Sequence, residues 1–354
     1  MSDEEITKSS RREFIAATAA TVAAASLSSC SSEQKLNREL PVELTPEQLA
    51  KKKSGRSQVA IIECKDYEQD IFALIKNGLG QIKLPDLKGK HVVLKPNMVE
   101  YRADKPVTTN PALLAAAIEL AKSCGASQIT VAEGPGHMRD TEYLLDVTGL
   151  GAVCKNAGVP YVDLNLDDLE AMDNSNGFNE INPFYLPRTI VKADYVISVP
   201  KLKTHHWVGM TCSMKNLFGT VPGRKYGWPK NLLHIKGIPH SIIDLQHLVK
   251  PQLAIVDAIV AMEGDGPING MAKHFGYVVV GQDVAAVDAT CARMIGMDPD
   301  ELAYIKMAGR VVGNTDAAQI DIFGPAIKDI VQTFDRPITM KDKSLLKQAA
   351  EQGS

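Results

Sequence analysis

The sequence lacks a strong bias of charge, because its 39 basic and 42 acidic residues give a formal net charge of −3. A protein dedicated to nucleic acid needs a basic face for its phosphate contacts, so we expect no nucleic acid among the partners. No run of 18 apolar residues occurs, which excludes a membrane-spanning helix. With 45% hydrophobic and 23% charged residues, the composition is that of a folded globular protein.

The sequence also lacks clustered cysteines. Beyond residue 30 the sequence has five widely spaced cysteines and no C-x-x-C motif: Cys64, Cys124, Cys154, Cys212 and Cys291. An odd, scattered set fits neither a disulfide framework nor the ligands of zinc. We therefore predict that this chain has no iron–sulfur cluster ligand set, and that most of these cysteines are small buried hydrophobes.

Several motifs of common enzyme classes are absent. The sequence has no G-x-x-x-x-G-K-[ST] phosphate loop, no G-x-G-x-x-G dinucleotide motif, no G-x-S-x-G elbow and no H-E-x-x-H. Their absence disfavours an ATPase, a nicotinamide dehydrogenase, an α/β-hydrolase and a zincin.

The N-terminus has the features of an export signal. Arg11 and Arg12 precede a weakly apolar stretch at 16–27, an order that resembles a twin-arginine signal. The sequence Leu27-Ser28-Ser29-Cys30 resembles a lipobox, in which Cys30 is acylated. We predict an export signal over 1–29, the twin-arginine export machinery as a partner, and a lipid anchor on the periplasmic side of a bacterial membrane. The alternative is an ordinary alanine-rich helix with a chance arginine pair.

The rest of the chain reads as a lipidated tether over 30–57, one α/β domain over 58–336 and a polar tail over 337–354. Short apolar runs alternate with helical stretches, which predicts a mostly parallel sheet flanked by helices. The predicted strands are Val59–Ile62, His91–Leu94, Gln128–Ala132, Tyr195–Val199, Leu253–Val256 and Tyr277–Val280. Helices are predicted over 111–124, 283–295 and 299–309, and two long irregular loops, 165–187 and 219–239, are typical of functional segments.

Charged residues follow these strands within three positions in five cases. In open parallel sheets, ligands bind outside the carboxyl ends of the strands, so this edge is the predicted site. The first charged residues after the strands are Lys95, Glu133, Lys201, Asp257 and Asp283. Each of them alone also fits a solvated surface charge, and Asp283 equally fits the N-cap of the next helix.

These blocks, in this order, resemble the domain of unknown function 362 family over roughly residues 59–335. The blocks that carry the resemblance are Lys95-Pro96-Asn97, Thr109-Asn110-Pro111, Glu133-Gly134, residues 198–205, Lys215-Asn216-Leu217-Phe218-Gly219, His234, Val256-Asp257, residues 263–267, and Asp283 with Ala285 and Asp288. The resemblance implies one family domain and a map of motifs, without a reaction. Some members resemble fusions to ferredoxin-type cysteine clusters, which this chain does not contain.

The residue types at this edge predict three roles. Cations and amides suited to a phosphate or carboxylate are Lys95, Asn97, Lys201, Lys203, Thr204, Lys215 and Asn216. Asp257, Glu263 and Asp288 are oxygen ligands for a divalent metal ion of unknown identity. Proton transfer is assigned to His205, His234 and Glu133. Because side chains alternate along a strand, Lys201 and Lys203 are expected on one face, gripping one anion.

We therefore expect an exported, metal-assisted enzyme that acts on a small phosphate- or carboxylate-bearing substrate. One alternative is a binding protein that captures an anion or metal without turnover, and another is an accessory factor for periplasmic redox proteins. Catalysis requires a group with a shifted pKa in the cleft, whereas capture does not, so this property separates the first two hypotheses.

Overall fold

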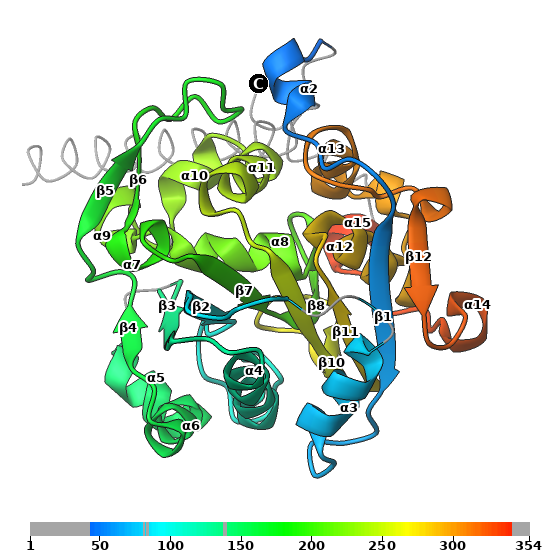
Figure 1. The fold of residues 1–354 in the computed structure, drawn as a ribbon. Coiled ribbons are helices and arrows are strands. Elements are labelled where there is room, and N and C mark those ends of the chain that lie inside the picture. Colours follow the sequence, from blue (N-terminus) through cyan, green and yellow to red (C-terminus); the bar gives the residue numbers. More distant parts are fainter. Residues whose placement is uncertain (1–42, 81, 83–84, 137–139, 342–354) are drawn as a thin grey trace, which may run out of the picture.

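The computed structural model describes residues 43–80, 82, 85–136 and 140–341 (Figure 1). Arg11, Arg12 and Cys30 lie outside the described residues, as does most of the polar tail, so the export signal and the lipid anchor remain predictions. The described part is a mixed α/β fold in which one central sheet lies between two groups of helices (Figure 1).

The central sheet of the described chain has ten strands. They are β1 (Ser57–Glu63), β2 (His91–Pro96), β3 (Gln128–Glu133), β4 (Tyr161–Asp163), β7 (Tyr195–Val199), β8 (Lys201–His205), β9 (Gly209–Thr211), β10 (Leu253–Glu263), β11 (Met271–Gly281) and β12 (Ile320–Phe323). Eight lie in the order β12-β1-β11-β10-β7-β2-β3-β4, with β8 beside β10 and β9 beside β8. β11 is antiparallel to both of its neighbours, while the other pairs on this path are parallel, which confirms a mostly parallel sheet.

Helices cover both faces of the sheet, so its strands are apolar on both sides. One layer is built from α3 (Ile71–Leu79), α4 (Pro111–Ser123), α5 (Thr141–Thr148) and α6 (Leu150–Ala157). The other contains α8 (Ser213–Asn216), α11 (Ile238–Val249), α12 (Val284–Met294) and α13 (Ala303–Val311). In β1, Val59 and Ile61 pack into the second layer while Ala60 and Ile62 pack into the first, as the period of two requires.

All six predicted strands are present, and β10 and β11 are longer than predicted. The predicted helix at 111–124 is α4, whose N-cap Asn110 accepts a hydrogen bond from the Ala112 amide. The helix predicted at 283–295 is α12. The one predicted at 299–309 is a 3₁₀ turn, Pro299–Glu301, followed by α13.

Asp283 lies away from the predicted site edge. Because β11 is antiparallel, Gly281 at its end pairs with Ala254 at the start of β10, on the opposite edge of the sheet. The Asp283 side chain accepts from the amides of Ala285 and Ala286 and so caps α12. The interpretation of Asp283 as a site residue was wrong, and its role as a helix cap is confirmed.

Segments for which no helix or strand was predicted contain further short elements. They are α2 (Pro46–Ala50) within the predicted tether, the hairpin β5 (Leu169–Met172)–β6 (Phe184–Pro187) and α7 (Arg188–Val191), α9 (Gly223–Tyr226), α10 (Asn231–Ile235), α14 (Ile327–Ile330) and α15 (Ile338–Lys341). α2 begins with a capping box in which the Thr45 side chain accepts from the Gln48 amide, and it packs against α13. Part of the predicted tether is therefore attached to the domain.

Candidate functional site

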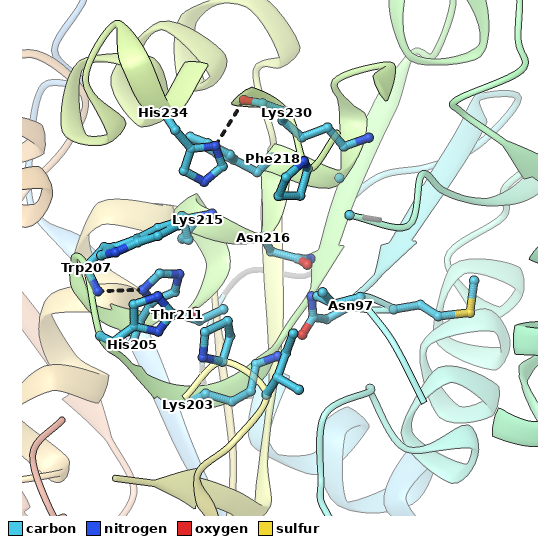
Figure 2. Close-up of a pocket in the computed structure, with 18 of the residues that line it drawn as sticks. Asn97, Lys203, His205, Trp207, Thr211, Lys215, Asn216, Phe218, Lys230 and His234 are labelled. Atoms are coloured by element: carbon cyan, nitrogen blue, oxygen red, sulfur yellow. Dashed lines mark hydrogen bonds between the residues drawn. The ribbon is translucent and has the colours of Figure 1, made fainter. Parts of the chain in front are cut away.

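A cavity of about 210 Å³ opens at the carboxyl ends of β2 and β3, beside β8, α8 and α10. Figure 2 shows the side chains that line it, which come from segments far apart in the sequence. We call it the lysine cavity, because its polar lining is dominated by Lys203, Lys215 and Lys230. The other polar and aromatic lining residues used below are Asn97, Glu133, His205, His206, Trp207, Thr211, Asn216, Phe218 and His234.

Behind the cavity lies a buried ion pair. Lys95, at the end of β2, is fully buried and donates to Glu133 at 2.5 Å and to the Asn216 side chain at 3.1 Å. The backbone closes tightly over this pair, since a Cβ atom on Gly219 would lie 1.8 Å from Glu133 Oε1. Only glycine fits at this position. Glu133 is thus committed to Lys95, although it also lines the cavity.

The three lysines of the cavity have no carboxylate partner within the described chain. Lys203 Nζ donates to the Val107 carbonyl at 2.9 Å, and Lys230 Nζ donates to Asn165 Oδ1 at 2.6 Å. The Lys215 ammonium lies 3.6 Å from the centre of the Phe218 ring, a cation–π contact. All three side chains are at least nine-tenths buried.

Burial without a counter-charge changes how these lysines titrate. Desolvation, reinforced by Lys95, lowers the pKa of Lys215 to about 7. Desolvation also lowers the pKa of Lys230 to about 7, although Glu133 opposes it. The pKa of Lys203 is lowered well below its usual value by burial and by the charges of its lysine neighbours. A bound anion would offset all three effects, because an opposite charge favours the ammonium form.

Histidines also line the cavity. Burial lowers the pKa of His234 to about 4 and that of His205 well below its usual value, so both rings are neutral at pH 7. His234 Nδ1 lies 3.0 Å from the Lys230 carbonyl and therefore carries its proton there, which leaves Nε2 as an acceptor. The Trp207 amide donates to His205 Nδ1 at 3.1 Å, so the proton of His205 is on Nε2 (Figure 2).

Two buried polar atoms on the lining have no protein partner among the described residues. They are Asn97 Oδ1 and Thr211 Oγ1, in side chains that are 5% and 4% exposed. A buried polar atom without a hydrogen bond is costly, so such atoms mark places where a ligand or water completes the site. Together with the lysines, they provide both donors and an acceptor toward one occupant.

A second cavity of about 370 Å³ is lined by Tyr67 and by the segment 101–111, and we call it the Tyr67 cavity. Lys201 lines it and forms a buried ion pair with Asp257 at 2.6 Å. Tyr67 accepts from Lys201 and donates to Asp257, each at 2.8 Å. The expectation that Lys201 and Lys203 grip one anion together was wrong. The register of β8 against β10 shifts between the two lysines, so each faces a different cavity.

The three carboxylates predicted to hold a metal do not converge. Asp257 is bound to Lys201, Glu263 pairs with Lys273 at 2.8 Å, and Asp288 accepts from the amides of Ser213 and Met214. Across the described ranges, no group of three or more histidine, cysteine or acidic side chains has a metal-binding arrangement. The predicted ligand set was therefore wrong, because each carboxylate has its own structural partner.

Asp288 nevertheless contributes to the site. Its pKa is raised to about 6 by burial, and its bonds to the Ser213 and Met214 amides fix the start of α8. That short helix carries Lys215 and Asn216 into the cavity. Thr204, predicted to bind the anion, instead donates to the Gly264 carbonyl at 2.7 Å and does not line the cavity.

Seven of the predicted site residues do line the lysine cavity: Asn97, Glu133, Lys203, His205, Lys215, Asn216 and His234. Lys230, Trp207, Thr211 and Phe218 also line it and were not predicted. The signal for Lys230 was its place in the long irregular loop 219–239. Asn165, which orients Lys230 from the first of the two long loops, has no local pattern that marks it.

Comparison with known proteins finds similarity in the same part of the chain. The family described as "Domain of unknown function (DUF362)" matches residues 92–293, which include most of β2, all of β3 and β7 to β11, and the three lysines of the cavity. The chain belongs to this family. A DUF362-like relative, the thylakoid-associated protein sll1697 of Synechocystis sp., is 27% identical over 254 residues, which is 69% of this chain and 74% of that protein.

Solved structures show only distant similarity to this DUF362 chain. The lactate racemase apoprotein from Thermoanaerobacterium thermosaccharolyticum is 12% identical, with a TM-score of 0.40 over 67% of this chain and 57% of that one. A protein from Thermotoga maritima is 10% identical, with a TM-score of 0.33 over 62% of this chain and 58% of that one. The chain thus spans less than two thirds of either structure.

Proposed function

We propose that this protein is an enzyme that binds a small phosphate- or carboxylate-bearing substrate in the lysine cavity. The observation that carries the proposal is the set of Lys203, Lys215 and Lys230, buried around one cavity. Of the two carboxylates that line it, Glu133 pairs with Lys95 and Asp265 accepts from the Ile338 amide. Ammonium groups in such a place are costly without an anion. A phosphate or carboxylate provides the missing charge and accepts hydrogen bonds from the lysines.

The shifted pKa values favour turnover over simple capture. Lys215 and Lys230, with pKa values of about 7, exchange protons readily near neutral pH. His234 presents an unprotonated nitrogen in the same cavity, and a bound anion would raise its low pKa and make it a stronger base. Perturbed titratable groups that converge in one cavity are typical of catalytic sites.

Calorimetry of the full-length chain, purified in detergent, tests the binding step. We expect saturable, one-to-one binding of inorganic phosphate or of pyruvate at pH 7, and competition between the two. Exposed Lys225, which lies outside the cavity, provides the control variant Lys225→Met, with unchanged affinity. Absence of saturable binding of both anions at millimolar concentration would contradict the proposal.

A divalent metal remains a prediction, now without a ligand set among the described residues. Metal analysis of the purified chain, with and without prior chelation, tests it directly. If anion affinity survives chelation, the lysines alone hold the substrate. If chelation abolishes binding, a metal bridges the anion to groups that the predicted ligand set did not identify.

We further propose that the protein is exported and held at the membrane by lipid on Cys30, as the N-terminal sequence predicts. No helix in the described part of the chain is long and apolar enough to cross a bilayer. The relative from Synechocystis sp. is named for its association with thylakoids, which is compatible with attachment to a membrane surface. Replacing Arg11 and Arg12 with lysine should block export, and Cys30→Ala should release a soluble periplasmic form. Unchanged export of the double-lysine variant would contradict the twin-arginine prediction.

A further inference from the structure

Lys215 differs from every other buried lysine of the site. Lys95 and Lys201 each pair with a carboxylate, and Lys203 and Lys230 each donate to an oxygen. Among the described residues, Lys215 Nζ has no hydrogen-bond acceptor, and it lies 3.6 Å from the centre of the Phe218 ring. Its nitrogen is therefore not committed to a structural role.

The surroundings of Lys215 favour the neutral amine. Burial removes the water that would solvate its ammonium form, and Lys95 lies close enough to lower its pKa further. With a pKa of about 7, roughly half of the Lys215 side chains have a free lone pair at pH 7. A desolvated lysine beside another cation is the arrangement by which enzymes activate this side chain as a nucleophile.

We propose that Lys215 forms a covalent imine with a 2-oxo carboxylate bound in the lysine cavity. This inference rests on the proposed function, because Lys203 and Lys230 would hold the carboxylate while the neighbouring carbonyl meets Lys215 Nζ. A cavity of about 210 Å³ matches a small organic acid, and the rings of Phe218 and Trp207 provide an apolar wall for its carbon chain.

The chemistry balances without an oxidant or reductant. The Lys215 lone pair attacks the carbonyl carbon, the C–N bond forms, and the carbonyl electron pair moves to oxygen, which takes a proton. The resulting carbinolamine then loses its hydroxyl group as water when a second proton reaches that oxygen. The nitrogen lone pair expels the water and the nitrogen keeps one hydrogen, so amine, ketone and one proton from solvent become a protonated imine and one water molecule.

His234 extends the reaction beyond the imine. Its Nε2 is an acceptor in the same cavity, since Nδ1 is fixed on the Lys230 carbonyl. A protonated imine withdraws electrons from the adjacent carbon and acidifies its hydrogens. A base at His234 would then remove one of them to give an enamine, so the protein should exchange the methyl hydrogens of pyruvate with solvent.

Trapping with pyruvate and sodium cyanoborohydride tests the imine on the full-length chain. We expect a carboxyethyl group on Lys215, found by peptide mass spectrometry, at a level about tenfold or more above that on exposed Lys225. In deuterium oxide, the methyl signal of pyruvate should decay in the presence of the protein. Propionate, which has the carboxylate but no keto group, should compete for binding and leave no adduct.

Lys215→Arg separates this inference from anion binding, because arginine keeps the positive charge and forms no imine. We expect this variant to lose both the adduct and the exchange of deuterium, and to bind phosphate more tightly than Lys215→Met, which lacks the charge. If wild-type protein binds pyruvate but shows no adduct on Lys215, the imine is overturned while the proposed function stands. If neither pyruvate nor phosphate binds, both are overturned.

Discussion

The two cavities at the strand ends use the same side chain in opposite ways. In the Tyr67 cavity, Lys201 is neutralised by Asp257 at 2.6 Å, and Tyr67 hydrogen-bonds to both. In the lysine cavity, Lys203 and Lys215 are equally buried but have no acidic partner in the described chain. One arrangement is complete within the protein, whereas the other has an external anion as its counter-charge in our proposal.

The presence or absence of a counter-charge distinguishes structural lysines from candidate functional lysines better than burial does. Lys95 and Lys201 are as deeply buried as any lysine of the site, yet their charges are balanced. Removing one member of a balanced pair leaves the other charge alone in the interior, which destabilises the fold. Removing a lysine that has no counter-charge removes the desolvation cost that its ammonium group imposes on the ligand-free protein. The two classes should therefore respond oppositely to substitution.

The largest effect is expected at Asp257. Asp257→Asn leaves Lys201 without a counter-charge and weakens its bonded group with Tyr67, so the free energy of unfolding should fall by about 3 kcal/mol in urea titrations. The control is Glu263→Gln, which breaks the partly exposed pair with Lys273 and should cost less than about 1 kcal/mol. Equal stability of the two variants would remove the distinction between a buried and a surface pair.

Lys215→Met should give the reverse pattern. We expect its phosphate affinity to fall by about tenfold to a hundredfold, since a charge-assisted hydrogen bond is lost. Its unfolding free energy should remain equal to that of the wild type or rise, because no protein hydrogen bond is removed. Calorimetry and urea unfolding measure the two quantities on the same preparations. A stability loss as large as that of Asp257→Asn would show that Lys215 is structural.

The sequence located the edge of the sheet at which the lysine cavity opens, because the strands of a parallel sheet are nearly continuous apolar runs. Six such runs were located, and the charged blocks that follow β2, β3 and β7 do supply the site. The capped start of α4 at Asn110 was predictable for a similar reason, since a side-chain cap and a following proline form a local signal.

The sequence alone could not show which residues pair with the charged side chains. The pairing of Asp257 with Lys201 depends on the register of β8 against β10 and on Tyr67, which lies 190 residues from Asp257 along the chain. The sequence therefore predicted a metal site from Asp257, Glu263 and Asp288. In the structure, lysines and backbone amides bind these carboxylates instead. Lys230 reaches the cavity only because Asn165, 65 residues away, holds its ammonium group.

The pH dependence of stability sharpens the same contrast. Lys215 has a pKa of about 7 in the folded chain, against 10.5 as the ordinary value, so the unfolded chain binds more protons between these pH values. Stability should consequently rise with pH above 7, by up to about 1 kcal/mol per pH unit for this lysine. The quantity to measure is the difference between wild type and Lys215→Met in urea at pH 7.0 to 8.5, which cancels other titrations. A difference that does not change with pH would contradict an unbalanced lysine, and saturating phosphate should flatten it.

The smallest effect is expected at Trp207, which tells the two cavities apart. The chain has two tryptophans, and only Trp207 lines the lysine cavity, with its ring 5.1 Å from that of His234. Because this ring is 39% exposed, Trp207→Phe should weaken phosphate binding by less than about threefold. The fluorescence of Trp207 is measured in the Trp228→Phe background, because the centre of the Trp228 ring lies 5.0 Å from Lys230 Nζ, and it should change on binding. An anion held in the Tyr67 cavity would leave Trp207 fluorescence unchanged, so a silent Trp207 with undiminished phosphate affinity would move the binding site to the side of Lys201.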